Sequence, residues 1–503
     1  MAALHFRKGA APFSNHPISM PSRRAFIRTT IVAASSLAAG IFKAVAAVTA
    51  KAATVKTPAP PAPKNAVDFL TPSDPAYPAA RRVYNAAIQT KPQLIARCTT
   101  AEGVQEALRR AAEEKRPVAV KAGGHSFEGF CLNEDGLVVD VSSMRDLHLD
   151  EKTGLLTAGA GCRLEEVNQF LLAKGRFLPA GSCGSVGLAG LTLGGGYGMY
   201  SRKWGLTCDH LQSVEMVDGS GKIRHSDDEP DLLWACRGGG NGHFGVVTKM
   251  TFATRRPPAG FSSWKFRIYK LDVARATALL ETWFAETAHL PREAFSAWVM
   301  NGSQVTIVVT TIGSRTDKNL VAACRKLGGF SKKTTTAGPV AIGKALSWYF
   351  GDPTPAAFKN ASAGYYKGMN DVRAALPVAL GQVLAVPGLI FQVNTLGGAI
   401  AEGEDSAYPH RAYPYLGERQ AYWDKPAQAE RCIAGVGKIG EALAAAGIDR
   451  HYANYPDLAY KDWPTAYYGA ENYARLQKLK ALWDPEDRIR HAQSVRLPGA
   501  SVG

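Results

Sequence analysis

The chain has 503 residues, 46% of them hydrophobic and 20% charged, which is the composition of a globular protein with room for one large domain or two to three smaller ones. The formal net charge is +16, but residues 1–56 carry eight Lys and Arg and no Asp or Glu, so half of the excess lies in this segment. The rest has no basic run with interleaved aromatic residues, so nucleic-acid binding is not expected.

The first 52 residues have the order of a secretory signal. Arg23 and Arg24 precede an apolar stretch over 29–42 that is too short to span a bilayer as a helix, and small residues follow. The paired arginines before Ala-Phe-Ile resemble a twin-arginine signal, which the bacterial Tat machinery reads. We therefore expect a signal peptide over 1–52, a periplasmic or secreted protein and no stable membrane span; a disordered basic tail is the alternative.

A Pro- and Ala-rich linker is predicted over 53–75. Between residues 76 and 255, strand and helix patterns alternate. Apolar stripes predict helices over 103–116 and 163–175, the second capped by Gly175, and a hairpin is predicted over 211–226.

Residues 256–450 have fewer glycines and more aromatics, which predicts a second domain of sheet with covering helices. The tail, 451–503, ends in a helix that Asp484-Pro485 terminates. Six aromatic side chains of the second domain either stack on a substrate ring or belong to its core: Trp264, Trp283, Trp298, Trp348, Tyr349 and Phe350.

The eight cysteines are dispersed, and the chain has neither Cys-x-x-Cys nor His-Glu-x-x-His. No metal site is therefore expected. Some cysteines could pair in an oxidising compartment, but the spacing does not say which.

The stretch "VAVKAGGHSFEGFC" (118–131) reads as a buried strand entering a glycine-rich turn. A nucleophile elbow would need Gly-x-Ser-x-Gly, but Glu128 stands where the second glycine belongs, which disfavours a serine hydrolase. The alternative is backbone that clears space for a large ligand.

Two more glycine-rich segments support this second interpretation: "PAGSCGSVGLAGLTLGGGYG" (179–198) and "ACRGGGNGHFGVVT" (235–248). Neither has the Rossmann spacing before a helix. Glycine backbone can form nests for a pyrophosphate and admit a flat ring, so the three segments together predict a bound dinucleotide.

These segments and the tail "HYANYPD…YYGAENYARLQKLKALWDPED" occur in the order found in the berberine bridge enzyme-like group of vanillyl-alcohol-oxidase (PCMH-type) FAD flavoproteins, which the chain resembles over roughly 80–503. The resemblance implies an α+β fold. It would comprise an FAD-binding domain of two α/β subdomains (76–255), a substrate domain with an antiparallel sheet covered by helices (256–450), and a C-terminal segment (451–503) that returns to the flavin.

The resemblance also implies covalent FAD. His125 matches the histidine that bonds the flavin 8α-methyl, and Cys183 the cysteine that many members link to flavin C6, so bicovalent attachment is expected. Val186 matches a position associated with oxygen access. The remaining residues implied to line the cofactor are Lys121, Ala122, Gly123, Gly124, Ser126, Gly187, Gly190, Leu193, Gly194, Gly195, Tyr197 and Val247.

Tyr452 and Tyr455 match a segment that presents tyrosines to the substrate, and Tyr452 is expected to be the base. A tyrosine packing on the flavin is the alternative. At Asn394 several relatives have a carboxylate or Gln. Because Asn cannot act as a base, either the tyrosine carries more of the proton transfer, or Gln392 and Asn394 only orient the substrate.

The resemblance predicts an oxidase that removes a hydride from a C–H next to oxygen in a small-molecule substrate, with O₂ as oxidant and hydrogen peroxide as product. The alternatives are a flavin dehydrogenase with another acceptor, an amine or alkaloid oxidase, and a non-catalytic flavin-binding protein.

Overall fold

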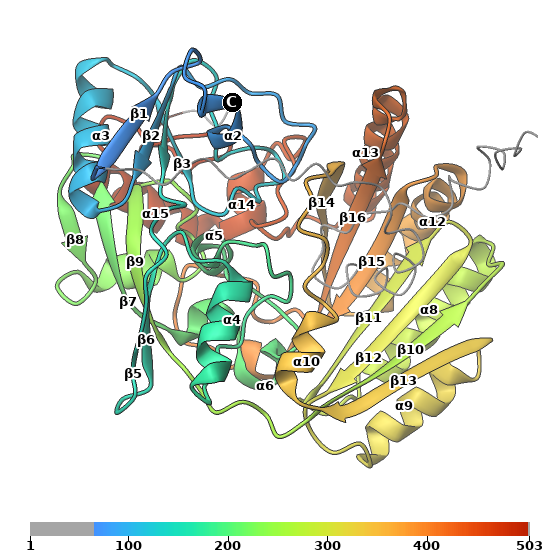
Figure 1. Cartoon of the computed structure of the whole chain (residues 1–503). Coiled ribbons are helices and arrows are strands. Elements are labelled where there is room, and N and C mark those ends of the chain that lie inside the picture. The colour runs from blue at the N-terminus through green and yellow to red at the C-terminus, as the bar shows by residue number, and fades with distance from the viewer. Residues whose placement is uncertain (1–64, 501–503) are drawn as a thin grey trace, which may run out of the picture.

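The computed structural model describes residues 65–500, which form two lobes side by side (Figure 1). The predicted signal peptide, 1–52, lies outside the described residues. Within 65–500, no helix has both the length and the apolar character needed to cross a bilayer.

The first lobe contains a four-stranded sheet. Its order is β1 (Val67–Leu70), β2 (Leu94–Cys98), β4 (Leu137–Asp140) and β3 (Val118–Lys121). β2, β4 and β3 are parallel, and β1 runs antiparallel along β2. β1 lies inside the stretch expected to be linker, which corrects that boundary: the folded part begins before residue 76.

Two helices accompany this sheet, the short α2 (Tyr77–Ala80) and α3 (Ala101–Glu113). The side chain of Thr100 caps α3 by accepting a hydrogen bond from Gly103 N at 3.2 Å. The apolar stripe predicted for this helix is buried, which places α3 against the sheet.

A second, five-stranded antiparallel sheet completes the lobe, in the order β5 (Leu147–Asp150), β6 (Leu155–Gly159), β9 (Gly245–Ala253), β7 (Leu211–Asp218) and β8 (Ile223–His225). The predicted hairpin is the β7–β8 pair. The helices between these strands are α4 (Leu164–Ala173), α5 (Leu188–Leu193), α6 (Ser201–Trp204), a 3₁₀ turn (Thr207–His210) and α7 (Pro230–Cys236). Gly175, just beyond α4, has φ of +64°, as its predicted capping role requires.

The second lobe is a seven-stranded antiparallel sheet. Its order is β13 (Lys333–Val340), β10 (Phe261–Ile268), β12 (Gln304–Thr311), β11 (Ala294–Asn301), β15 (Leu389–Thr395), β16 (Tyr415–Trp423) and β14 (Ala357–Tyr366). Four helices pack on one face: α8 (Val273–Thr287), α9 (Lys318–Gly328), α12 (Leu376–Ala385) and α13 (Ala429–Ala445) (Figure 1). The fold is therefore α+β, as predicted. Shorter segments are α10 (Ile342–Ser347), α11 (Met369–Val372) and 3₁₀ turns at Arg373–Ala375, Gly398–Ile400 and Pro426–Gln428.

Side chains alternate between the two faces of this sheet. On β15, Phe391 and Val393 pack against the helices, whereas Ile390 joins a second apolar cluster on the opposite face, as does Leu396 just after the strand. That second cluster also contains Tyr452 and other tyrosines of the first lobe and the tail. We call the opposite face the tyrosine face, since several tyrosines gather on it.

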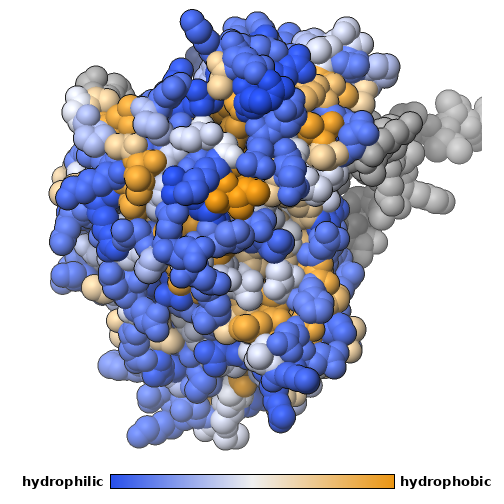
Figure 2. All heavy atoms as spheres, turned by 90° about the vertical axis from the view of Figure 1, so that its left-hand side faces the viewer, coloured by the Kyte–Doolittle hydropathy of each residue, from blue (hydrophilic) through white to orange (hydrophobic). Residues whose placement is uncertain are grey.

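After residue 450 the chain returns to the first lobe through α14 (Trp463–Tyr468) and α15 (Ala470–Trp483). Leu476, Leu479 and Trp483 are buried in the core of that lobe, and α15 ends at Trp483, immediately before Asp484-Pro485, as predicted. The outer face of the first lobe is mostly hydrophilic, with small separate apolar groups (Figure 2).

Candidate active site

All three glycine-rich segments meet at one cavity of about 240 Å³. The loop after β3, the segment around α5 and the loop before β9 each form part of its wall, and the C-terminal tail closes it. Segments far apart in the sequence are therefore joined as the dinucleotide hypothesis requires. Of the predicted cofactor residues, those that line the cavity are Ala122, Gly123, Gly124, His125, Ser126, Cys183, Val186, Gly187, Gly190, Leu193, Tyr197 and Val247.

The walls of the cavity fit a flat, phosphate-bearing ligand. Gly123 and Gly187 touch through their backbones, and a Cβ at Gly123 would lie 2.5 Å from the Gly187 Cα. A Cβ at Gly190 would meet no atom within 4 Å, because this glycine faces open space. Side chains are thus missing both where the loops cross and where a ligand would lie, which matches the demands of FAD.

Three predicted cofactor residues do not line the cavity, which corrects those assignments. The side chain of Lys121 is buried in an ion pair with Asp140, with Nζ 2.8 Å from Oδ2, and also donates to Ala80 O. A Cβ at Gly194 would collide with the Asn454 side chain, and Gly195 packs on Tyr408. At Gly194 and Gly195, side chains of the tail and of the second lobe fill the space that a Cβ would need.

His125 and Cys183 both line the cavity. The His125 ring stacks on Tyr84 with centroids 4.1 Å apart, and burial lowers its pKa to about 3, so its imidazole is neutral. The Cys183 Sγ lies 3.5 Å from Ser185 Oγ, and burial raises the thiol pKa. A neutral imidazole is the nucleophilic form, whereas the thiol needs a further influence to ionise.

Tyr452 and Tyr455 line the cavity from the tail. The Tyr452 oxygen accepts hydrogen bonds from Gly196 N at 2.9 Å and from Asn454 Nδ2 at 3.0 Å. Burial raises its pKa to about 12, and the two donors oppose this shift. The hydroxyls of Tyr455 and Tyr197 are 2.7 Å apart, so these two phenols form a hydrogen-bonded pair.

Gln392 and Asn394 do not line the cavity. Both lie buried on the tyrosine face of β15, where Gln392 Nε2 donates to Asn394 Oδ1 at 2.9 Å. Asn394 Nδ2 in turn donates to the Tyr197 oxygen at 3.2 Å. The amides are therefore set back from the cavity: Asn394 contacts the tyrosine pair, and Gln392 contacts Asn394.

Several lining residues were missed by sequence reasoning. Asn241, Gly242 and His243 belong to the third glycine segment, whose pattern was recognised without these positions being singled out. The final stretch had no pattern that pointed to it, yet it reaches the cavity because residues 489–490 pair with Val118. From the tail, the missed residues are Ala453, Asn454, Pro456, Tyr467, Tyr468, Arg490, His491 and Gln493.

Three of the six aromatic residues singled out in the second lobe belong to its core. Trp283 and Trp298 are fully buried on the helix side of the sheet and Tyr349 is fully buried in the tyrosine-face cluster, so all three are core. Trp264 stacks under Arg315, with the guanidinium 5.2 Å from its ring. The backbone of Phe350 accepts a hydrogen bond from Gly184 N, next to Cys183.

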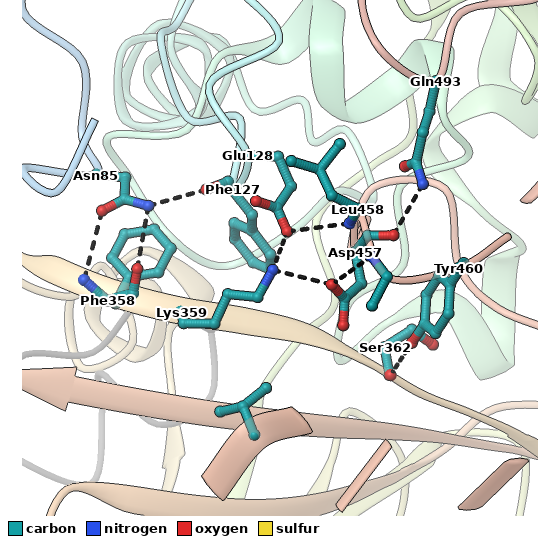
Figure 3. A network of polar contacts seen from close by, with 12 residues as sticks. Asn85, Phe127, Glu128, Phe358, Lys359, Ser362, Asp457, Leu458, Tyr460 and Gln493 are labelled. Atoms are coloured by element: carbon teal, nitrogen blue, oxygen red, sulfur yellow. Dashed lines mark hydrogen bonds and ion pairs between the residues drawn. The ribbon is translucent and has the colours of Figure 1, made fainter. Parts of the chain in front are cut away.

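One ionic network ties the loop after β3, the second lobe and the tail together (Figure 3). Lys359 of β14 pairs with Glu128 and lies 2.9 Å from Asp457 Oδ1. Asp457 also pairs with Arg419 at 2.6 Å. Since Glu128 follows His125 by three residues and Asp457 follows Tyr455 by two, the network fixes both edges of the cavity.

Comparisons with known proteins agree with this geometry. The FAD binding domain family matches residues 92–227, and the family "Berberine and berberine like" matches 451–496. The FAD-linked oxidoreductase YgaK of Bacillus subtilis (strain 168) is 29% identical over 441 residues, covering 85% of this chain and 96% of that protein.

The chitooligosaccharide oxidase of Gibberella zeae is 27% identical over 447 residues, covering 82% of this chain and 89% of that protein. Among solved structures, Physcomitrella patens BBE-like 1 superposes with a TM-score of 0.79 at 25% identity, covering 86% of this chain and 98% of that one.

A first lobe of a four-stranded and a five-stranded sheet with a glycine-walled cavity, joined to a lobe with a seven-stranded antiparallel sheet, together with these matches defines an FAD-linked oxidoreductase. Within that class, the two matching family models and the solved structures support a berberine bridge enzyme-like FAD-linked oxidase.

Proposed function

We propose that this protein is an exported oxidase that removes a hydride from a C–H next to oxygen in an alcohol, sugar or lactol and releases hydrogen peroxide. The observation that carries the proposal is the position of Tyr452, whose oxygen accepts two hydrogen bonds at the wall of the cavity that also contains His125 and Cys183. The likeness to a chitooligosaccharide oxidase supports a hydroxylated substrate.

Bound FAD supplies the acceptor for the hydride and returns the electron pair to dioxygen as hydrogen peroxide. The glycine segments would hold it by backbone contact, because they present N–H groups without side chains to obstruct them. His125 and Cys183 are proposed as the two points of covalent attachment. The neutral imidazole of His125 supports the first, and the cavity position of Cys183 supports the second.

Tyr452 is proposed to take the hydroxyl proton of the substrate while the carbon–hydrogen bond breaks, leaving a carbonyl group. Gly196 N–H and the Asn454 amide favour the phenolate because both donate to its oxygen. Since burial still raises the pKa of Tyr452 to about 12, the phenolate is the minor form at neutral pH. We therefore expect turnover to rise with pH above neutrality.

Dioxygen as acceptor is proposed from Val186, a small β-branched residue in the cavity wall at the position that the family resemblance associates with oxygen access. Export by the Tat pathway is proposed from Arg23 and Arg24 alone. It predicts that replacing both with Lys leaves the FAD-loaded protein in the cytoplasm, as judged by cell fractionation.

The decisive experiment measures oxygen uptake and peroxide release by the purified yellow protein against simple alcohols, monosaccharides, chitooligosaccharides and cyclic amines. With a hydroxylated substrate, release of one peroxide for each substrate molecule oxidised supports the proposal. Reduction of an artificial dye without oxygen uptake would instead identify a dehydrogenase. Turnover of amines alone would identify an amine oxidase.

A further inference from the structure

Glu418 is a buried acid that neither the glycine segments nor the tyrosine motif includes. It lies in the middle of β16, fully buried, opposite Gln392 of β15 and Ser362 of β14. Its neighbours two residues away on β16, Leu416 and Gln420, place its side chain on the tyrosine face, because alternate residues share a face.

Neither carboxylate oxygen of Glu418 has a hydrogen-bond partner of normal geometry among residues 65–500. The polar neighbour that favours its ionised form is Gln420, but burial outweighs it and raises the pKa of Glu418 well above the ordinary value. An apolar residue or a glutamine would be cheaper to bury here, so an acid without partners calls for a chemical explanation.

The tyrosine pair lies on this same face. Ser362, which pairs with Glu418 in the sheet, donates its N–H to the Tyr455 backbone oxygen at 2.9 Å. Tyr455 therefore lies one strand away from Glu418. The negative charge of Glu418 raises the pKa of both Tyr197 and Tyr455, in addition to the larger effect of burial.

The amides of β15 and β16 determine where the tyrosine protons can go. Gln420 donates to Gln392 at 3.3 Å, Gln392 donates to Asn394, and Asn394 donates to the Tyr197 oxygen. All three bonds run in one direction, so Tyr197 can only accept from Asn394. The pair has two phenolic protons, and the contact between the two hydroxyls uses one of them.

The second proton must therefore point either into the cavity or toward an acceptor behind the pair. Glu418 is a fully buried acid on the same face, and although neither of its oxygens hydrogen-bonds a phenol, its charge acts on both tyrosines across the space between them. When the carboxyl group is ionised, it attracts this proton and leaves a phenolic oxygen facing the cavity. When it is neutral, the pair keeps a hydroxyl group that donates into the cavity.

We propose that Glu418 is a positioning residue that decides whether the Tyr197–Tyr455 pair accepts or donates a hydrogen bond to a substrate hydroxyl group. The inference rests on the proposed function, since it assumes a hydroxylated substrate whose proton must leave. An accepting pair assists loss of that proton. Turnover should thus fall as the pH drops through the pKa of Glu418 and the carboxyl group becomes neutral.

Other groups facing Glu418 do not change this assignment. The tyrosine face carries Asn360 on β14, the amides of β15, and Tyr422 on β16, whose hydroxyl donates to Gln420 at 3.2 Å. Arg419 points to the opposite face, where its guanidinium donates to Val436 O of α13. No ion pair with Glu418 forms within the described residues.

The test compares the FAD-loaded wild type with Glu418→Gln and, as a control, Glu281→Gln on the exposed face of α8, where Glu281 pairs only with Arg373. We expect Glu418→Gln to lower kcat/KM about tenfold or more and to remove the acid limb of its pH profile. The control should reproduce the wild-type profile. A Glu418→Gln profile that superimposes on the wild type would overturn the proposal.

A second readout needs no substrate. In holoenzyme carrying ¹³C at the tyrosine Cζ, Tyr197→Phe and Tyr455→Phe identify the two signals. Both should move through one common titration in the wild type and stay constant in Glu418→Gln. If the signals of the wild type do not titrate together, the coupling is refuted even where the enzyme turns over. If they do but no alcohol or sugar is oxidised, the proposed function fails and the coupling stands.

Glu418→Asp covers the case in which the glutamine variant does not fold. It keeps a carboxyl group on the same face, so the acid limb and the common titration should remain, with shifted midpoints. If a folded, yellow Glu418→Asp protein lacked both the acid limb of the pH profile and the common tyrosine titration, the proposal would be wrong.

Discussion

Gly123 and Gly187 face each other so closely that neither has room for a side chain: a Cβ at Gly187 would lie 2.8 Å from the Gly123 Cα. Two loops that are 64 residues apart in the chain therefore cross with their backbones in contact (187 − 123 = 64). This crossing holds the His125 loop beside the segment that begins at Cys183.

Replacing Gly187 with Ala should separate the two loops, since the obstructing atoms are backbone and cannot rotate away. We expect Gly187→Ala to lower FAD content at least tenfold, measured from the visible absorbance of purified protein. Gly437→Ala is the matched control, because Gly437 lies on α13 with nothing within 4 Å of a Cβ. That change should leave FAD content unaltered and stabilise the helix by about 0.5–1 kcal/mol.

The covalent attachments can be separated by mass. Protein denatured in acid should keep FAD in the wild type, in His125→Ala and in Cys183→Ala, but lose it in the double variant. Cys131→Ala is the control, since Cys131 is another buried thiol in the same cavity wall. A wild-type protein that releases FAD on denaturation would contradict both assignments.

Tyr452→Phe removes the proposed base but keeps the ring. Its kcat/KM should fall by about 10²–10⁴-fold while the flavin spectrum is unchanged. The rise of turnover above neutral pH should also disappear, because the group responsible, whose pKa burial raises to about 12, is gone. Tyr269→Phe, at a partly exposed tyrosine outside the cavity, should behave as the wild type. Equal activity of Tyr452→Phe and the wild type would exclude Tyr452 as base.

Lys359→Met should leave Glu128 and Asp457 without their shared cation. Breaking a mostly buried ion pair costs about 2–4 kcal/mol, so the Tm should fall by about 2–4 °C and FAD retention should weaken. Arg373→Met breaks the exposed pair with Glu281, whose side chains are 47% and 51% exposed. This control should cost no more than about 0.5–1 kcal/mol. If Lys359→Met and Arg373→Met changed the Tm and FAD retention equally, the buried network would not be what stabilises the cavity.

Buried histidines predict loss of stability in mild acid. Burial lowers the pKa of His410, His451 and His491 to about 3, so each stays neutral in the folded protein and takes a proton on unfolding below pH about 6.5. Each lowers the free energy of unfolding by about 1.4 kcal/mol per pH unit below that value. The Tm should drop steeply between pH 6.5 and 5, and His451→Gln should reduce the slope. A Tm independent of pH between 6.5 and 5 would contradict this contribution of the buried histidines.

From the sequence alone, the three glycine-rich segments predicted a bound dinucleotide, because glycines leave room where a ligand lies close to the backbone, and the resemblance of the motifs implied that it is FAD. It also located His125, Cys183, Tyr452 and Tyr455 on the cavity wall, since each sits inside a compact motif. Local periodicity was sufficient for α3, α4, α15 and the β7–β8 hairpin, as each buries one regular stripe. It failed at β1, whose four residues become a strand only by pairing with β2.

Only the tertiary structure decided which polar groups meet. Asn394 contacts Tyr197 across 197 residues of chain, and Glu418 has no motif around it that distinguishes it from a surface acid. Their roles depend on the register of β15 with β16 and on the path of the tail along β14. The physical reason is that a β-strand assigns a side chain to a face by parity, while the neighbours on that face come from distant segments.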